Sequence, residues 1–144
     1  MDRFYFLHHV FFHVRNFYPC ISDVTLNFSP LKENLWGIFC NDTRTAVLCS
    51  DKIEENPFRP TMWAVIAIHE LYHGWQYSNG VFNKKAHKAY CSNARTYWKI
   101  EAATDAWAID WIKSLLIVDE KELEFYLEHR PKKIVRRKRN LHWD

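Results

Sequence analysis

The segment MWAVIAIHELYHGWQ, Met62–Gln76, places two histidines and a glutamate in the middle of an apolar run. Apolar residues would cover nearly every side of a helix with this sequence, so the run predicts a buried helix from Met62 to about Tyr77. The pair Asn79-Gly80 marks its end. Buried imidazole and carboxylate groups are costly unless each finds a partner. We therefore expect this helix to bring its polar side chains to a common partner.

The two histidines, His69 and His73, have the spacing of a metal-binding pair. Residues at i and i+4 of a helix lie on one face, and two imidazoles presented in this way can bind one Zn²⁺ through one ring nitrogen each. Glu70 would point beside that face, where it can hold a water molecule at the metal and accept its proton. This is the HExxH pattern. The alternative is a pair of core histidines hydrogen-bonded to backbone or carboxylate groups.

A second apolar segment, ARTYWKIEAATDAWAIDWIKSLL, contains two carboxylates with the same helical spacing. Ser92 or Asn93 can cap a helix that runs to about Leu116. A catalytic zinc site uses three protein ligands and one open position. We expect Glu101 to be the third ligand, and Asp105 to accept the N–H of a zinc-bound histidine. The alternative is that both carboxylates lie on a solvated face.

The combination of HELYH with the later EAATDAWA resembles the gluzincin clan of zinc metallopeptidases. The closer likeness is to its minimal members and to the ImmA/IrrE-type metallopeptidase domain, and it covers about Gly37 to Ile112. The sequence departs from that pattern where Thr104 replaces the usual alanine and Trp107 the usual phenylalanine. The resemblance implies a zincin-like fold, a Zn²⁺ cofactor and a peptide or protein substrate.

The stretch HELYHGWQ also resembles SprT-like proteins, which take a third histidine from shortly downstream. His87, in KKAHKAY, is the possible match, but Lys88 replaces the glycine that often follows, and no zinc ribbon is present. His87 also falls in a polar, Lys-rich connection, expected from Ser78 to Cys91, where a histidine can be solvated. The sequence therefore favours Glu101 over His87 as the third ligand.

The remaining segments predict an α+β fold, with a small antiparallel sheet packed on the HExxH helix and on the second ligand-bearing helix. A short strand is expected at Val24–Phe28. Leu35–Cys40 and Arg44–Ser50 flank the turn residues NDT and predict a hairpin. Residues 3–18 fit a helix or a strand. Thr61 is expected to cap the HExxH helix, and Asp119 with Glu122 to form a capping box for a third helix that ends at Pro131.

The length of 144 residues suits a single metallopeptidase-like domain, expected at 1–130, followed by a basic tail at 131–144. Seven Lys or Arg residues and no acid occur between Arg130 and Arg139. Such a tail is either solvated or binds a partner, either a nucleic acid through its phosphates or a protein.

Composition excludes several other classes. Three glycines cannot supply a Gly-rich phosphate loop or a dinucleotide fingerprint. The four cysteines form no CxxC pair, no apolar run is long enough to span a membrane, and the apolar N-terminus lacks the features of a signal peptide. We therefore expect reduced thiols and a location in the cytoplasm, or in a particle assembled there. The cysteines are Cys20, Cys40, Cys49 and Cys91.

The leading hypothesis is a zinc metallopeptidase with ligands His69, His73 and Glu101 and with Glu70 as general base. Tyr77, Tyr90, Tyr97 and His87 are the candidates for stabilising the oxyanion. One alternative is a structural or binding component, for example of a phage or another mobile element, that keeps zinc for stability. Another is a SprT-like protease that acts on DNA-bound protein, for which the basic tail would be the anchor.

Overall fold

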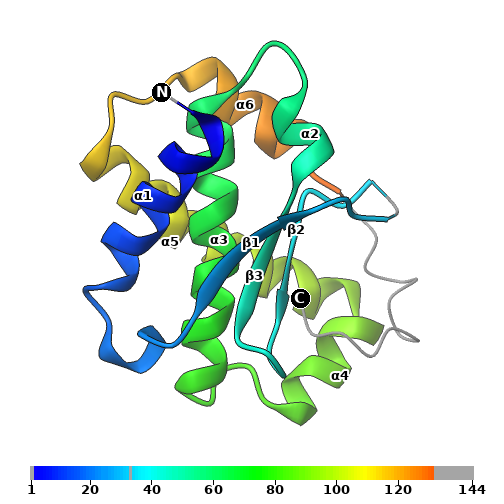
Figure 1. The fold of residues 1–144 in the computed structure, drawn as a ribbon. Coiled ribbons are helices and arrows are strands. Elements are labelled where there is room, and N and C mark those ends of the chain that lie inside the picture. The colour runs from blue at the N-terminus through cyan, green and yellow to red at the C-terminus, as the bar shows by residue number, and fades with distance from the viewer. Residues whose placement is uncertain (1, 33, 132–144) are drawn as a thin grey trace.

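The computed structural model describes residues 2–32 and 34–131 (Figure 1). Residues 132–144 of the expected basic tail lie outside this range. The described residues form an α+β fold with six α-helices, one short 3₁₀ helix and one three-stranded sheet. The elements are α1 (Arg3–Arg15), η1 (Pro19–Ile21), β1 (Thr25–Ser29), β2 (Gly37–Cys40), β3 (Thr45–Cys49), α2 (Ser50–Glu54), α3 (Pro60–Ser78), α4 (Lys84–Ser92), α5 (Ala94–Leu115) and α6 (Glu120–His129).

The sheet has the order β1-β3-β2 and is mixed. The predicted hairpin is confirmed, because β2 pairs antiparallel with β3, but the prediction of an antiparallel sheet is wrong for β1, which runs parallel to β3. The register explains the difference. Ser29, at the end of β1, pairs with Cys49, and Gly37, at the start of β2, pairs with Leu48. The connection at 30–36 therefore crosses over the end of β3, which is inserted between the first two strands.

The N-terminal segment, for which the sequence left helix and strand open, is the helix α1. The Asp2 carboxylate caps it by accepting hydrogen bonds from two backbone N–H groups of the first turn. Its buried side chains recur at the helical period, and this face packs against α3. They are Leu7, Val10, Phe11 and Val14.

Helix α3 is the centre of the core, as its apolar sequence predicted, and it contacts α1, α5, α6 and the sheet (Figure 1). At the start of α3, two residues that were expected to act as helix caps, Thr61 and Glu122, make other hydrogen bonds. Thr61 does not cap α3; its hydroxyl accepts the backbone N–H of Asp119 at 3.1 Å. Asp119 caps α6, but the Glu122 carboxylate accepts the N–H of Met62 at 3.1 Å instead of closing a capping box. The N-terminal ends of α3 and α6 are thereby joined.

The connection expected from Ser78 to Cys91 contains a helix, α4, which the sequence reading missed. Asn83 caps α4, and the apolar face of α4 packs on α5. Phe82, Tyr90, Cys91 and Tyr97 form a second hydrophobic cluster there, apart from the main core. Asn93 caps α5, because Ser92 belongs to the last turn of α4. Among the described residues, no helix combines the length and apolarity needed to cross a membrane.

Candidate metal centre

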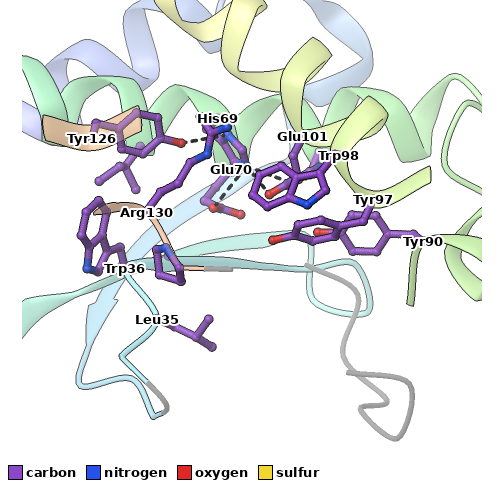
Figure 2. A pocket seen from close by; sticks show the side chains of 14 residues that line it. Leu35, Trp36, His69, Glu70, Tyr90, Tyr97, Trp98, Glu101, Tyr126 and Arg130 are labelled. Carbon is purple, nitrogen blue, oxygen red and sulfur yellow. Dashed lines mark hydrogen bonds and ion pairs between the residues drawn. The ribbon is translucent and has the colours of Figure 1, made fainter. Parts of the chain in front are cut away.

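The imidazoles of His69 and His73 are in contact on one face of α3, as their spacing predicted, with 4.8 Å between their ring centroids. Figure 2 shows His69 beside Glu70 and Glu101. The Nε2 atoms of the two histidines are 3.2 Å apart, and both residues are almost completely buried. Two buried imidazole nitrogens that face each other at this distance are either linked by a proton or are directed at a common cation.

Glu101 of α5 reaches both histidines. Its Oε1 lies 3.4 Å from Nε2 of His69, and its Oε2 lies 3.3 Å from Nε2 of His73. Zn–N bonds of about 2.0–2.1 Å in a tetrahedron place neighbouring ligand atoms about 3.3–3.4 Å apart. The two nitrogens are 3.2 Å apart, and each lies at a separation of this size from a different oxygen of Glu101, so the types of donor and their spacing are compatible with a zinc ion. Glu101 is thus directed inward, and Asp105 is only 3% exposed, which contradicts the solvated-face alternative.

The Glu70 carboxylate lies next to the two imidazoles but is farther from them than the Glu101 carboxylate is. Its Oε2 is 4.0 Å from Nε2 of His69, and ligand atoms of His69, Glu70 and His73 all lie within 4.8 Å of one another. Strand β2 approaches Glu70 closely at Gly37, where an added Cβ would be 3.1 Å from Cγ and 3.2 Å from Oε2 of Glu70. A side chain at residue 37 would therefore force Glu70 to shift from its position beside the two histidines.

Asp105 holds His69 in the orientation that a metal ligand requires. Its Oδ1 lies 2.7 Å from Nδ1 of His69, and it also accepts the Tyr126 hydroxyl at 2.6 Å and Arg130 Nη1, on Oδ2, at 2.7 Å. With the imidazole proton on Nδ1, the Nε2 lone pair faces His73 and Glu101. Tyr126 and Arg130 were not anticipated, because nothing in the sequence connects α6 to a residue on α5.

His73 is oriented in a similar way from within its own helix. The Oε1 of Gln76 lies 2.9 Å from Nδ1 of His73, and the Nε2 of Gln76 donates to the hydroxyl of Thr104 at 3.2 Å. Gln76 was also missed, although its position three residues after His73 was a usable signal. Thr104 is buried, and its hydroxyl holds the amide of Gln76 in place.

In the absence of metal, Glu101 and the two histidines shift one another's pKa. Burial opposes charging of His69, but Glu101 and Asp105 outweigh it and raise the pKa of His69 well above its usual value of 6.5. Burial likewise opposes charging of His73, yet Glu101 raises the pKa of this residue. Burial favours the neutral acid for Glu101, but the two imidazoles hold its pKa far below its usual 4.5. Without metal, the carboxylate is therefore ionised and shares protons with the imidazoles.

His87 lies on α4 and is only 8% exposed, so the expectation of a solvated connection is wrong. Cys91 Sγ is 3.4 Å from its Nε2. The Phe82 ring contacts both His87, at 5.7 Å between ring centroids, and His73, at 6.0 Å. Glu101 is the residue with direct polar contacts to both candidate ligands, which favours it over His87 as the third ligand.

A cavity of about 60 Å³ opens beside the centre, which is more than the roughly 10–15 Å³ that one ordered water needs. Of the four candidates for an oxyanion donor, Tyr90 and Tyr97 line it. Its wall includes five Trp or Tyr side chains, and three of these, Trp36, Trp98 and Tyr126, were expected in no functional role (Figure 2). The lining residues are Leu35, Trp36, Gly37, Ile66, His69, Glu70, His73, Tyr90, Tyr97, Trp98, Glu101, Tyr126, Arg130 and Pro131.

Comparison of the chain with known protein families, with curated proteins and with solved structures found no match.

Proposed function

We propose that this protein is a zinc-dependent peptide hydrolase with a zincin-like site. The observation that carries the proposal is the separation of 3.2 to 3.4 Å among Nε2 of His69, Nε2 of His73 and the Glu101 carboxylate, with Glu70 beside them. Three protein ligands leave a fourth position of a tetrahedral zinc open, as a catalytic site requires and a closed structural site does not.

Bound zinc would supply Lewis acidity and a position for the attacking water. The side chains of the protein would transfer the protons, orient the two histidines and stabilise the oxyanion. Glu70 accepts a proton from that water and passes it to the nitrogen of the leaving amine. Asp105 keeps the proton of His69 on Nδ1, and Gln76 does the same for His73. Tyr90 and Tyr97 line the cavity and can stabilise a developing oxyanion, whereas the hydroxyl of Tyr126, which also lines it, donates to Asp105.

A binding component with structural zinc is the second candidate. The small volume of the cavity favours it, because about 60 Å³ does not enclose a peptide side chain. Glu70 distinguishes the two candidates. A structural site needs only ligands, whereas peptide hydrolysis needs a base that is close to the metal without coordinating it.

The test combines metal content with hydrolysis. We expect about one zinc per chain by mass spectrometry of the native protein. His69→Ala and His73→Ala should lose it and lower the melting temperature, because metal binding contributes to folding. Glu70→Gln should keep both zinc and melting temperature but abolish hydrolysis of an unfolded reporter protein, because the amide cannot accept a proton.

His129→Ala is the matched control, since His129 is exposed on α6 and hydrogen-bonds only to its own helix among the described residues. It should change neither zinc content nor hydrolysis. Zinc retained in a His69→Ala/His73→Ala protein would refute the metal centre. A zinc-loaded native protein with no hydrolysis of any peptide would favour the structural candidate.

A further inference from the structure

Three polar side chains occur at intervals of four residues along α6, at Glu122, Tyr126 and Arg130. Residues at this spacing lie on one face of a helix, and Arg130, the first residue after α6, continues the line. All three contact other helices. Glu122 accepts the backbone N–H of Met62 at the start of α3, and Tyr126 and Arg130 donate to Asp105 of α5. One face of α6 therefore connects the start of α3 to a carboxylate beside the metal centre.

The Asp105 carboxylate has protein donors at both of its oxygens. Oδ1 lies 2.7 Å from Nδ1 of His69 and accepts the hydroxyl of Tyr126 at 2.6 Å. Oδ2 accepts Nη1 of Arg130 at 2.7 Å. Asp105 is 3% exposed and Tyr126 is 4% exposed, so protein groups and not solvent hold this carboxylate. Rotation of the carboxylate away from His69 would break charge-assisted hydrogen bonds at both oxygens.

Arg130 also supplies the positive charge that Asp105 needs when His69 acts as a metal ligand. A histidine that binds a metal is a neutral imidazole, so it donates its Nδ1–H without neutralising the carboxylate. A buried carboxylate is costly unless a cation or several donors accompany it. The guanidinium of Arg130 is permanently charged and reaches Oδ2 directly, so it stabilises Asp105 in the form that orients His69.

The guanidinium of Arg130 is itself held by aromatic rings. Its central carbon lies 5.2 Å from the centre of the Trp98 ring and 5.9 Å from the centre of the Tyr126 ring. Cations at these distances are attracted to the face of a ring. All three side chains line the cavity of the metal centre (Figure 2). A guanidinium has no lone pair to offer a metal, so an effect of Arg130 on metal binding must pass through a group that it bonds, which is Asp105.

On the basis of the metal site in the proposed function, we propose that Tyr126 and Arg130 are positioning residues of the metal centre. They fix the Asp105 carboxylate, which keeps the imidazole proton of His69 on Nδ1 and leaves Nε2 free to bind the metal. Neither residue binds the metal or the substrate in this role. The metal affinity of a site whose candidate ligands lie on α3 and α5 therefore depends on α6, which carries no ligand.

The first test is the zinc affinity of the full chain, measured by competition with a chromophoric chelator. Arg130→Met removes the charge and the donor but keeps an unbranched stem, and we expect it to lower the affinity about tenfold. Tyr126→Phe removes one hydroxyl, and we expect a loss of about threefold. Arg130→Lys keeps a positive charge without the planar guanidinium, so its loss should be smaller than that of Arg130→Met.

Arg59→Met is the matched control, because Arg59 also places a cation on an aromatic ring of α6. Its guanidinium carbon lies 4.1 Å from the centre of the Phe125 ring. Arg59 is the N-cap residue of α3 and lies ten residues before His69, or about 15 Å along the helix axis. The substitution should lower the melting temperatures of zinc-loaded and chelator-treated protein equally and leave the zinc affinity unchanged. Circular dichroism of each variant establishes that the fold is intact.

The imidazole proton gives a readout that a loss of stability alone does not change. In zinc-loaded protein labelled with ¹⁵N-histidine, we expect NMR to show slow exchange of the His69 Nδ1 proton with solvent in the native chain and in Arg59→Met. Arg130→Met and Tyr126→Phe should both speed this exchange, because Asp105 then holds the imidazole less firmly.

Equal zinc affinity in the native chain, Arg130→Met and Tyr126→Phe would overturn the inference, and so would an equal loss in Arg130→Met and Arg59→Met. A native protein that binds no zinc would overturn the metal centre and the inference together. Hydrolysis is measured separately. A zinc-binding protein that cuts no peptide, but loses affinity in Arg130→Met and Tyr126→Phe, would refute the hydrolase and support the positioning role.

Discussion

At the scale of single residues, spacing within a helix was the informative signal. His69, His73, Glu101 and Asp105 were recognised because polar groups at i and i+4 in apolar helices need a partner, and the structure brings all four together. Their outer partners Tyr126 and Arg130 were not recognised. These residues come from another helix, and no local pattern reports which helices become neighbours.

A graded series of substitutions tests the ligand set. We expect Glu101→Ala to lower zinc affinity far more than His87→Ala, because Glu101 contacts both imidazoles directly. Asp105→Ala should give an intermediate loss, on the order of 10- to 100-fold, through the orientation of His69. Competition with a chromophoric chelator measures the three affinities. A larger loss for His87→Ala than for Glu101→Ala would assign the third ligand to His87.

At the scale of elements, apolar patterns predicted α3 and α5, cap residues predicted α6, and turn residues predicted the hairpin of β2 and β3. Helix α1 was left open between helix and strand, and α2 and α4 were not predicted. The helix α4 was read as a connection because its nine residues are mostly polar and carry three lysines. Its buried residues His87, Tyr90 and Cys91 face α5 and the Phe82 ring. A short helix of this kind is stabilised by tertiary contacts and not by its own propensity.

Contact between α3 and the sheet gives the prediction at this scale. Gly74 lies inside α3, where alanine would favour the helix by about 1 kcal/mol. However, a Cβ at residue 74 would be 3.1 Å from the Phe39 ring and 3.2 Å from Val24. Overpacking of this kind costs about 1–3 kcal/mol, so we expect Gly74→Ala to lower the free energy of unfolding in a urea titration.

Phe39→Leu is the control for this effect, because it removes the ring that the new methyl group would meet. In a Phe39→Leu background, Gly74→Ala should cost less or become stabilising. The same loss in both backgrounds would show that the ring contact is not the cause.

At the scale of the whole molecule, the candidate metal centre lies where α3, α5, α6 and β2 meet. The cluster is charged and buried, so the stability of the metal-free protein should depend on pH. The raised pKa of His69 contributes stability that is complete below its unfolded value of 6.5 and is lost as pH rises through the folded value. The lowered pKa of Glu101 contributes stability that is present above 4.5 and is lost as pH falls.

The chelator-treated protein should therefore be most stable between about pH 4.5 and 6.5, as far as this cluster is concerned. Zinc competes with protons for the imidazoles, so its binding should strengthen as pH rises. The difference in melting temperature between zinc-loaded and chelator-treated protein is then expected to grow from pH 5.5 to pH 8. A difference that is independent of pH would show that zinc does not displace these protons.

The sequence by itself determined the buried helix α3, the helix α5, and the hairpin of β2 and β3. It also determined that His69 and His73 share one helix face and that Glu101 and Asp105 share another. These features are local, because helical and strand periodicity place residues a few positions apart on one face. Only the tertiary structure decided the parallel pairing of β1, the burial of His87, the close approach of Gly37 to Glu70, and the link from Arg130 and Tyr126 to Asp105. These contacts join residues far apart in the chain, so they depend on how complete elements pack and not on any local pattern.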